Sequence, residues 1–188
     1  MSWNVNGLKN KTTDIDFMQF CNTFDIIGTT ETWSIDENDF SHMFVDYDVF
    51  ACNGEKPKRG RIAGGVAIFL KHDLIGGVKL LNTKQSDSVF LLLDKQFFGF
   101  TNDIVFGVVY LPPIDSKRHE RKSDLNFDSL EDVLLDLRTS YSTANFLISG
   151  DFNARSGTEH DFILDDSYDY IPSIDHVDVY NVDSFCAH

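Results

Sequence analysis

Apolar residues fall mostly in short runs separated by turn-forming residues, and this pattern predicts a protein built largely of strands. Runs of four to eight residues rich in branched and aromatic side chains, bounded by Gly, Pro, Asn or Asp, are typical of buried strands. The chain contains eight such runs, at Ser2–Val5, Asp25–Thr29, Tyr47–Cys52, Ala63–Leu70, Val78–Leu81, Val89–Leu93, Ile104–Tyr110 and Asn145–Ser149. The first is only a fragment of a strand, because Asn6-Gly7 follows as a turn signal.

Two stretches carry apolar residues at helical spacing instead. One helix is predicted from Thr13, a candidate N-cap, and a second from Asn126 to about Ser140. The inward-facing residues expected are Ile15, Met18, Cys21 and Phe24 in the first helix, and Phe127, Leu130, Val133, Leu134 and Leu137 in the second. Because several strands follow one another without a helix between them, the order favours mixed α/β sheets over a doubly wound parallel fold.

Length and composition narrow the class of protein. A chain of 188 residues, 42% of them hydrophobic, is expected to form a single globular domain spanning residues 1–188, and it shows no internal repeat or linker. No apolar run approaches the ~20 residues that span a bilayer, so no membrane partner is expected. Three widely spaced cysteines and a start without a signal-peptide pattern favour an intracellular location, in the nucleus or the cytoplasm.

The formal net charge of −14 argues against a surface coated for nucleic-acid binding, yet the basic residues are clustered. Two six-residue windows, 56–61 (KPKRGR) and 117–122 (KRHERK), each hold four of the 16 Lys and Arg residues. A solvated loop is the simpler interpretation of one such window, but two of them in an acidic chain favour phosphate-facing patches. The candidate nucleic-acid-binding residues are Lys58, Arg59, Arg61, Lys117, Arg118, Arg121 and Lys122.

Candidate chemistry follows the last predicted strand, in the segment 150–155 (GDFNAR). In an extended backbone alternate side chains share a face, so Asp151 and Asn153 would point the same way while Phe152 turns into the core. A carboxylate beside a carboxamide at a rigid strand end suits a water-activating base and a phosphate-orienting amide. The alternative is a strand end followed by an ordinary Asp/Asn turn.

Five segments in a fixed order carry a family resemblance: SWNVNGL (2–8), TETW (30–33), GGVAIF (64–69), VVYLPP (108–113) and GDFNAR (150–155). Together they resemble the endonuclease/exonuclease/phosphatase family, and ETW, VVYLPP and GDFNAR are most similar to the endonuclease domains of non-LTR (LINE-type) retrotransposons. The resemblance implies a four-layer αββα sandwich of two mixed sheets, as in deoxyribonuclease I. It also implies Mg²⁺-dependent hydrolysis of DNA, with Mn²⁺ as a substitute metal, and a parent protein fused to a reverse transcriptase.

The resemblance assigns roles residue by residue. Glu31 matches the metal carboxylate, Asn4 supports the metal and the phosphate, and Asp151 lies at the metal and activates water. Tyr110 reaches the scissile phosphate and Asn153 orients it. For Tyr110 a buried strand tyrosine is the alternative, and for Asn4 a satisfied strand-end amide. Trp33 would stack on a base or line the DNA groove, although plain core packing accounts for it equally well.

The family completes its site with a later aspartate and a Ser-Asp-His segment, several tens of residues beyond GDFN. This chain has neither in that register, so we expect a domain clipped at its N-terminus and lacking its C-terminal strands. Two alternatives to an active endonuclease therefore stay open. One is a catalytically dead remnant, and the other is a phosphatase of the same fold. The oligomeric state is not predicted.

Overall fold

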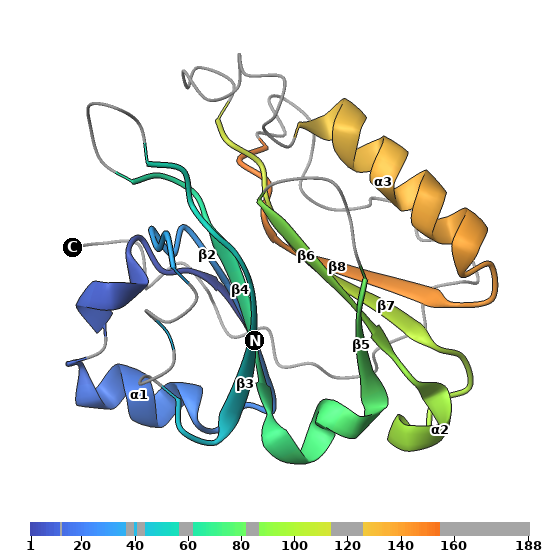
Figure 1. Cartoon of the computed structure of the whole chain (residues 1–188), viewed down its shortest axis with the longest axis horizontal. Helices are drawn as coiled ribbons and strands as arrows, with labels where there is room; N and C mark the ends of the chain where they lie inside the picture. Colours follow the sequence, from blue (N-terminus) through green and yellow to red (C-terminus); the bar gives the residue numbers. More distant parts are fainter. Residues whose placement is uncertain are drawn as a thin grey trace, which may run out of the picture. The chain divides into compact units, whose positions relative to one another are not determined.

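The computed structural model describes residues 1–11, 13–36, 40, 44–56, 62–81, 87–113 and 126–154. All of them belong to one compact unit, Met1–Ala154. The unit contains two four-stranded sheets, ordered β1-β2-β4-β3 and β5-β6-β7-β8 (Figure 1). The strands of the first sheet are β1 (Ser2–Asn4), β2 (Ile26–Thr30), β3 (Tyr47–Cys52) and β4 (Val66–Lys71). The strands of the second are β5 (Val78–Leu81), β6 (Ser88–Leu93), β7 (Ile104–Tyr110) and β8 (Asn145–Asp151).

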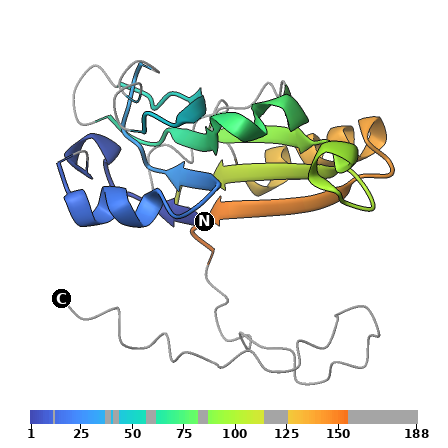
Figure 2. The ribbon, with the colours of Figure 1, turned by 90° about the horizontal axis from the view of Figure 1, so that it is seen from below.

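Each sheet combines one parallel pair with two antiparallel pairs, as expected for mixed sheets. β1 runs parallel to β2, and β7 runs parallel to β8. The other neighbours pair antiparallel. The sheets face each other so that β1 lies against β8, β2 against β7, and β4 against β6 and β7. Figure 2 shows the same ribbon from below, with β8 drawn in orange.

Helices cover the outer face of each sheet, which gives four layers. α1 (Ile15–Cys21) packs on the first sheet and α3 (Phe127–Ser140) on the second (Figure 1). Between the sheets lies a third apolar cluster, which includes Ile68, Leu91 and Val108. The predicted αββα sandwich of two mixed sheets is confirmed.

α3 forms where the sequence predicts it. Asn126 caps the helix with Ser129 in a reciprocal capping box, and Leu130, Val133 and Leu137 are buried. Phe127, which was expected on the buried face, is 53% exposed because it stands in the first turn, at the end of the apolar stripe.

The prediction for the first helix is wrong in two details. The cap is Asp14 rather than Thr13, since the Asp14 side chain accepts the N–H of Phe17. Ile15 is 69% exposed, whereas Phe17 and Cys21 are buried. Phe17 and Cys21 are four residues apart and share a face, while Ile15 lies about 200° around the helix from Phe17.

The entry to β4 also differs from the prediction. The strand begins at Val66 rather than Ala63, because Gly64 and Gly65 take φ angles of +69° and +88° and so leave the extended region. Among the described residues, the sequence patterns also missed three short helical segments: α2 (Lys95–Phe98) and the 3-10 helices η1 (Leu8–Lys11) and η3 (His72–Gly77).

Candidate functional site

The polar residues singled out in the sequence lie at the ends of the two parallel strand pairs. In the first sheet Asn4, the last residue of β1, pairs with Thr30, the last residue of β2. In the second sheet Tyr110, the last residue of β7, pairs with Asp151, the last residue of β8. Tyr110 belongs to the cluster between the sheets. Residues paired in register share a face, so Asp151 also points into the space between the sheets.

A direct hydrogen bond joins the two sheets at this end. The side-chain amide of Asn4 donates through Nδ2 to Oδ2 of Asp151 over 2.7 Å, across 147 positions of sequence. The other atom of the Asn4 amide, Oδ1, accepts the backbone N–H of Asn6 at 3.0 Å. Both ends of the Asn4 amide are thus occupied, and this arrangement fixes the direction in which it presents its N–H to the carboxylate.

The side-chain amide of Asn153 is tied to Leu111, the residue that follows β7. Its Nδ2 donates to the carbonyl of Leu111 at 2.8 Å, and its backbone N–H donates to Oδ1 of Asp151 at 3.0 Å. Its φ of +44° shows that the chain turns here instead of continuing as an extended strand. The strand end is therefore an Asp/Asn turn, and the same turn gathers Asp151 and Asn153 against the end of β7.

Glu31 directly follows β2 and is half-buried, with a left-handed φ of +53°. Its carbonyl accepts the N–H of Gly7 at 2.8 Å, which ties the segment after β2 to the segment after β1. Glu31 thus stands one residue beyond Thr30, the register partner of Asn4.

A metal at this site would rest on oxygen donors. The expected set is the carboxylates of Glu31 and Asp151 with the amide oxygen of Asn4. Mg²⁺ takes oxygen ligands, needs only one or two carboxylates and keeps several waters, so the residue types fit. Among the residues that the structure describes, no group of three or more His, Cys, Asp and Glu is placed to hold a metal ion.

Trp33 packs against the turn after β1. A β-carbon built on Gly7, whose φ is +97°, would lie 2.5 Å from Cε3 of Trp33, so the indole rests directly on the glycine. The indole is half-buried, and the Trp33 backbone N–H donates to the carbonyl of Gly64 at 3.0 Å. These contacts agree with the packing alternative for Trp33 and leave part of its ring accessible.

Lys58, Arg59, Arg61, Lys117, Arg118, Arg121 and Lys122 all lie outside the described residues. Sequence reasoning also missed one residue at this end of the molecule, the buried Asp87 at the start of β6. A single acid before an apolar run carries no distinctive sequence signal.

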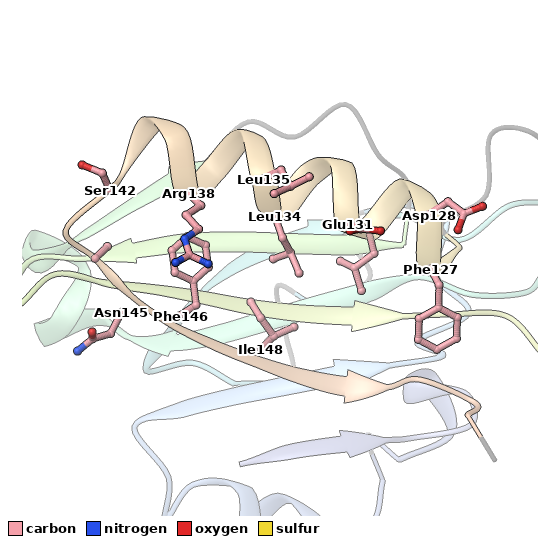
Figure 3. A pocket seen from close by; sticks show the side chains of 12 residues that line it. Phe127, Asp128, Glu131, Leu134, Leu135, Arg138, Ser142, Asn145, Phe146 and Ile148 are labelled. Carbon is pink, nitrogen blue, oxygen red and sulfur yellow. The ribbon is translucent and has the colours of Figure 1, made fainter. Parts of the chain in front are cut away.

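A separate groove of about 690 Å³ lies between α3 and β8, on the outer face of the second sheet (Figure 3). Leu134 of α3 and Ile148 of β8 point into it from opposite sides, and Asp128, Glu131 and Arg138 stand along the helix. Its lining includes none of the strand-end residues described above, and its apolar floor does not suit a phosphate. No helix in the described part of the chain has the length and apolar character needed to cross a bilayer.

Comparisons with known proteins bear on the family and the fold. Residues 1–177 match the model of the Endonuclease/Exonuclease/phosphatase family. No curated protein sequence matches the chain. Among solved structures, the AP endonuclease LMAP from Leishmania major is similar with a TM-score of 0.59 and 16% identity, over 79% of this chain and 53% of that one.

Two further solved structures share the fold. The 3' phosphatase NExo from Neisseria, bound to a product DNA hairpin, has a TM-score of 0.52 and 18% identity over 81% of this chain and 56% of that one. TDP2 from C. elegans has a TM-score of 0.52 and 16% identity over 83% of this chain and 48% of that one. The chain thus spans about half the length of these proteins, and at such identities the likeness shows the fold alone.

Proposed function

The chain belongs to the endonuclease/exonuclease/phosphatase family, and from this premise we propose that it hydrolyses phosphodiester bonds in DNA as a metal-dependent endonuclease. The observation that carries the proposal is the hydrogen bond between Asn4 and Asp151. It joins the ends of two strands from different sheets and orients a carboxylate at the mouth of the space between them. A fixed carboxylate is the group that phosphodiester hydrolysis needs for activating water.

The proposed roles combine the family resemblance with the hydrogen bonds of Asp151, Asn4 and Asn153. Asp151 accepts the proton of the attacking water, while Asn4 and the N–H of Asn153 hold its two oxygens in place. Tyr110 and Asn153 orient the phosphate. Tyr110 is the last residue of β7, and the Asn153 amide bonds to the carbonyl of the next residue, Leu111. Bound Mg²⁺ or Mn²⁺ would offset the negative charge of the phosphate and of the leaving oxygen. Glu31, Asp151 and the amide oxygen of Asn4 would hold it.

Within the family we propose the retrotransposon type, supported by the sequences ETW, VVYLPP and GDFNAR. DNA as substrate is supported by the two basic windows, 56–61 and 117–122. Phosphates attract clustered Lys and Arg without reading sequence, so these windows would grip the backbone of the duplex. A parent protein that also carries a reverse transcriptase belongs to the same proposal.

Nicking of supercoiled plasmid tests the proposal. Wild-type protein at micromolar concentration is incubated with Mg²⁺, with Mn²⁺, or with EDTA. We expect metal-dependent open circles, lost in Asp151→Asn and strongly reduced in Asn4→Ala. Asn145→Ala serves as the matched control, because Asn145 is an exposed asparagine at the opposite end of β8.

Parallel reactions separate the alternatives. Release of phosphate from an inositol phosphate, without plasmid nicking, would identify a phosphatase of the same fold. A folded protein without either activity would identify a catalytically inactive domain and would overturn the proposal for this chain.

A further inference from the structure

Asp87 is an acid buried between the two sheets at the same end as the candidate site. It directly precedes β6, its side chain is 1% exposed, and its φ is +57°. Burying a carboxylate is costly unless hydrogen bonds compensate for the lost water. The bonds that Asp87 makes therefore indicate what the residue does.

Asp87 bonds to both sheets through different atoms. Its Oδ1 accepts the backbone N–H of Gly65, at the entry to β4 in the first sheet, at 3.0 Å. Its carbonyl accepts the backbone N–H of Tyr110, at the end of β7 in the second sheet, at 2.9 Å. A single residue thus links the start of β4 to the strand end that carries Tyr110.

The Gly64-Gly65 segment, which Asp87 holds, is itself hydrogen-bonded to the residues after β2. The carbonyl of Gly65 accepts the N–H of Thr32 at 3.2 Å, and that of Gly64 accepts the N–H of Trp33 at 3.0 Å. Packing here leaves no room, since a β-carbon at Gly65 would lie 2.4 Å from Oγ1 of Thr32. The hydroxyls of Thr30 and Thr32 are buried without a hydrogen-bond partner in the described part of the chain. The segment after β2 is therefore held by the backbone bonds from Thr32 and Trp33 to the two glycines, and not by the threonine hydroxyls.

The two inter-sheet hydrogen bonds stand on either side of the central strands. Asn4–Asp151 links β1 to β8, and Gly65–Asp87 links the entry of β4 to the start of β6. Between them lie β2 and β7, whose ends carry Glu31 and Tyr110. The distance between Glu31 and Tyr110 is thus fixed by one inter-sheet hydrogen bond on each side of β2 and β7.

We infer that Asp87 is a positioning residue, which holds the Glu31–Trp33 segment and Tyr110 in register across the two sheets. The catalytic meaning of this register rests on the function proposed above. The mechanical link itself does not, so the two can be tested apart.

Three substitutions isolate the link. Asp87→Gly tolerates the left-handed φ and removes the carboxylate, whereas Asp87→Asn tolerates the same φ and keeps an acceptor oxygen for Gly65. Asp103→Ala is the matched control. Asp103 likewise accepts two backbone N–H groups, that of Lys95 through Oδ1 and that of Asn145 through its carbonyl, but it precedes β7 at the opposite end of the sheet.

Amide hydrogen exchange is the primary measurement, because a merely stabilising residue would not change it locally. In Asp87→Gly only the Gly65 N–H loses its acceptor, because the carbonyl that accepts from Tyr110 is kept. If the side chain holds the linked segments together, we expect exchange at Gly65, Thr32, Trp33 and Tyr110 all to rise roughly tenfold. Asp87→Asn should resemble wild type, and Asp103→Ala, which keeps the carbonyl that accepts from Asn145, should change exchange only near Lys95. If Asp87→Gly lowers global stability while these four amides keep their relative protection, the inference is overturned.

Two further readouts complete the test. In wild type the four amides should exchange as one cooperative group, so independent exchange would contradict the link even if Asp87→Gly did not fold. Plasmid nicking adds the catalytic part: Asp87→Gly should lower kcat by roughly 10- to 100-fold with a smaller change in KM, and Asp103→Ala should leave both unchanged. A wild type that does not nick refutes the proposed function, while the exchange data still decide the role of Asp87.

Discussion

At the scale of single residues, the site depends on short polar side chains at strand ends that hydrogen-bond to other segments of the chain. The Asn4 amide donates a hydrogen bond to Asp151 on the other sheet, and the Asn153 amide donates one to the carbonyl of Leu111. Asn6, Glu31, Trp33, Asp87 and Asn153 all have left-handed φ angles between +44° and +57°. Such backbone is uncommon outside glycine, and in the described part of the chain these five residues lie in segments that flank the candidate site.

Metal binding gives a prediction for Glu31. Two carboxylates that bind one cation should stabilise the folded chain when the cation is present, by about 2.7 kcal/mol at a concentration a hundredfold above the dissociation constant. Glu31→Gln should lose most of this gain while leaving the metal-free stability nearly unchanged. Thermal melts with and without Mg²⁺ measure both quantities. Equal gains in wild type and Glu31→Gln would show that Glu31 is not a ligand.

At the scale of elements, sequence patterns succeed where the cause is local. Asn126 and the stripe from Leu130 to Leu137 lie within one helix, so the sequence predicted α3 and its cap correctly. The same spacing misplaced Ile15, because which side of a short helix is buried depends on the sheet beneath it. The start of β4 was predicted too early because the sequence does not show that Gly64 and Gly65 adopt left-handed φ angles, which end the extended backbone before Val66.

The capping box of α3 provides a prediction about stability. Oδ1 of Asn126 accepts the N–H of Ser129 at 2.8 Å, and Oγ of Ser129 accepts the N–H of Asn126 at 2.9 Å. Asn126→Ala should lower the free energy of unfolding by about 1 kcal/mol. Asn126→Asp should lower it much less, because aspartate is also a good N-cap residue. Denaturant unfolding of the two variants measures this difference. Equal losses would mean that the side-chain bond contributes nothing.

The contact between the start of β3 and His72, the residue that follows β4, gives a prediction about pH. Nδ1 of His72 lies 2.8 Å from Oδ2 of Asp48, and Nε2 lies 3.0 Å from the carbonyl of Val45. Only the protonated ring donates to both, and the bond to Asp48, followed by that to Val45, raises the pKa of His72 above its ordinary value of 6.5. The stabilisation is therefore fully present below pH 6.5 and is lost as the pH rises through the raised pKa.

Denaturant midpoints of wild type and Asp48→Asn at pH 5.5 and pH 9, ~3.5 units apart around this transition, test the sign. The variant should be less stable than wild type at the lower pH, and the difference should shrink at the higher pH. Asp25→Asn is the control. Its partner Lys71, at 2.8 Å, has a pKa raised by the bond to Asp25 and stays charged at both pH values.

At the scale of the whole molecule, the sequence predicted the layers but not how the layers meet. Runs and spacings identified strands and helices, and the family resemblance supplied their arrangement. Asn4 and Asp151 are separated by 147 positions, so no local pattern could show that they touch. Asp87 was missed for the same reason, since its burial arises from segments of both sheets.

Close approach of the sheets at their centre gives the last prediction. A β-carbon at Gly28 of β2 would lie 2.6 Å from Cγ2 of Val108 on β7. The φ of Gly28 is not left-handed, so alanine is excluded there by space alone. Gly28→Ala should therefore cost about 1–3 kcal/mol through overpacking.

Truncating the opposing side chain should relieve that clash. Val108→Ala alone leaves a cavity, but in the double variant Gly28→Ala, Val108→Ala the new methyl group takes the place of the lost ones. We expect the double variant to be more stable than the sum of the single changes, with a coupling of about 0.5–3 kcal/mol in a denaturant-unfolding cycle. Gly76→Ala is the control, because Gly76 lies in η3 and a β-carbon there would meet only the ring edge of Phe97, at 3.4 Å. Additive single changes at Gly28 and Val108 would show that the two sheets do not meet at this pair, and the alignment of the strand ends beyond it would then need another cause.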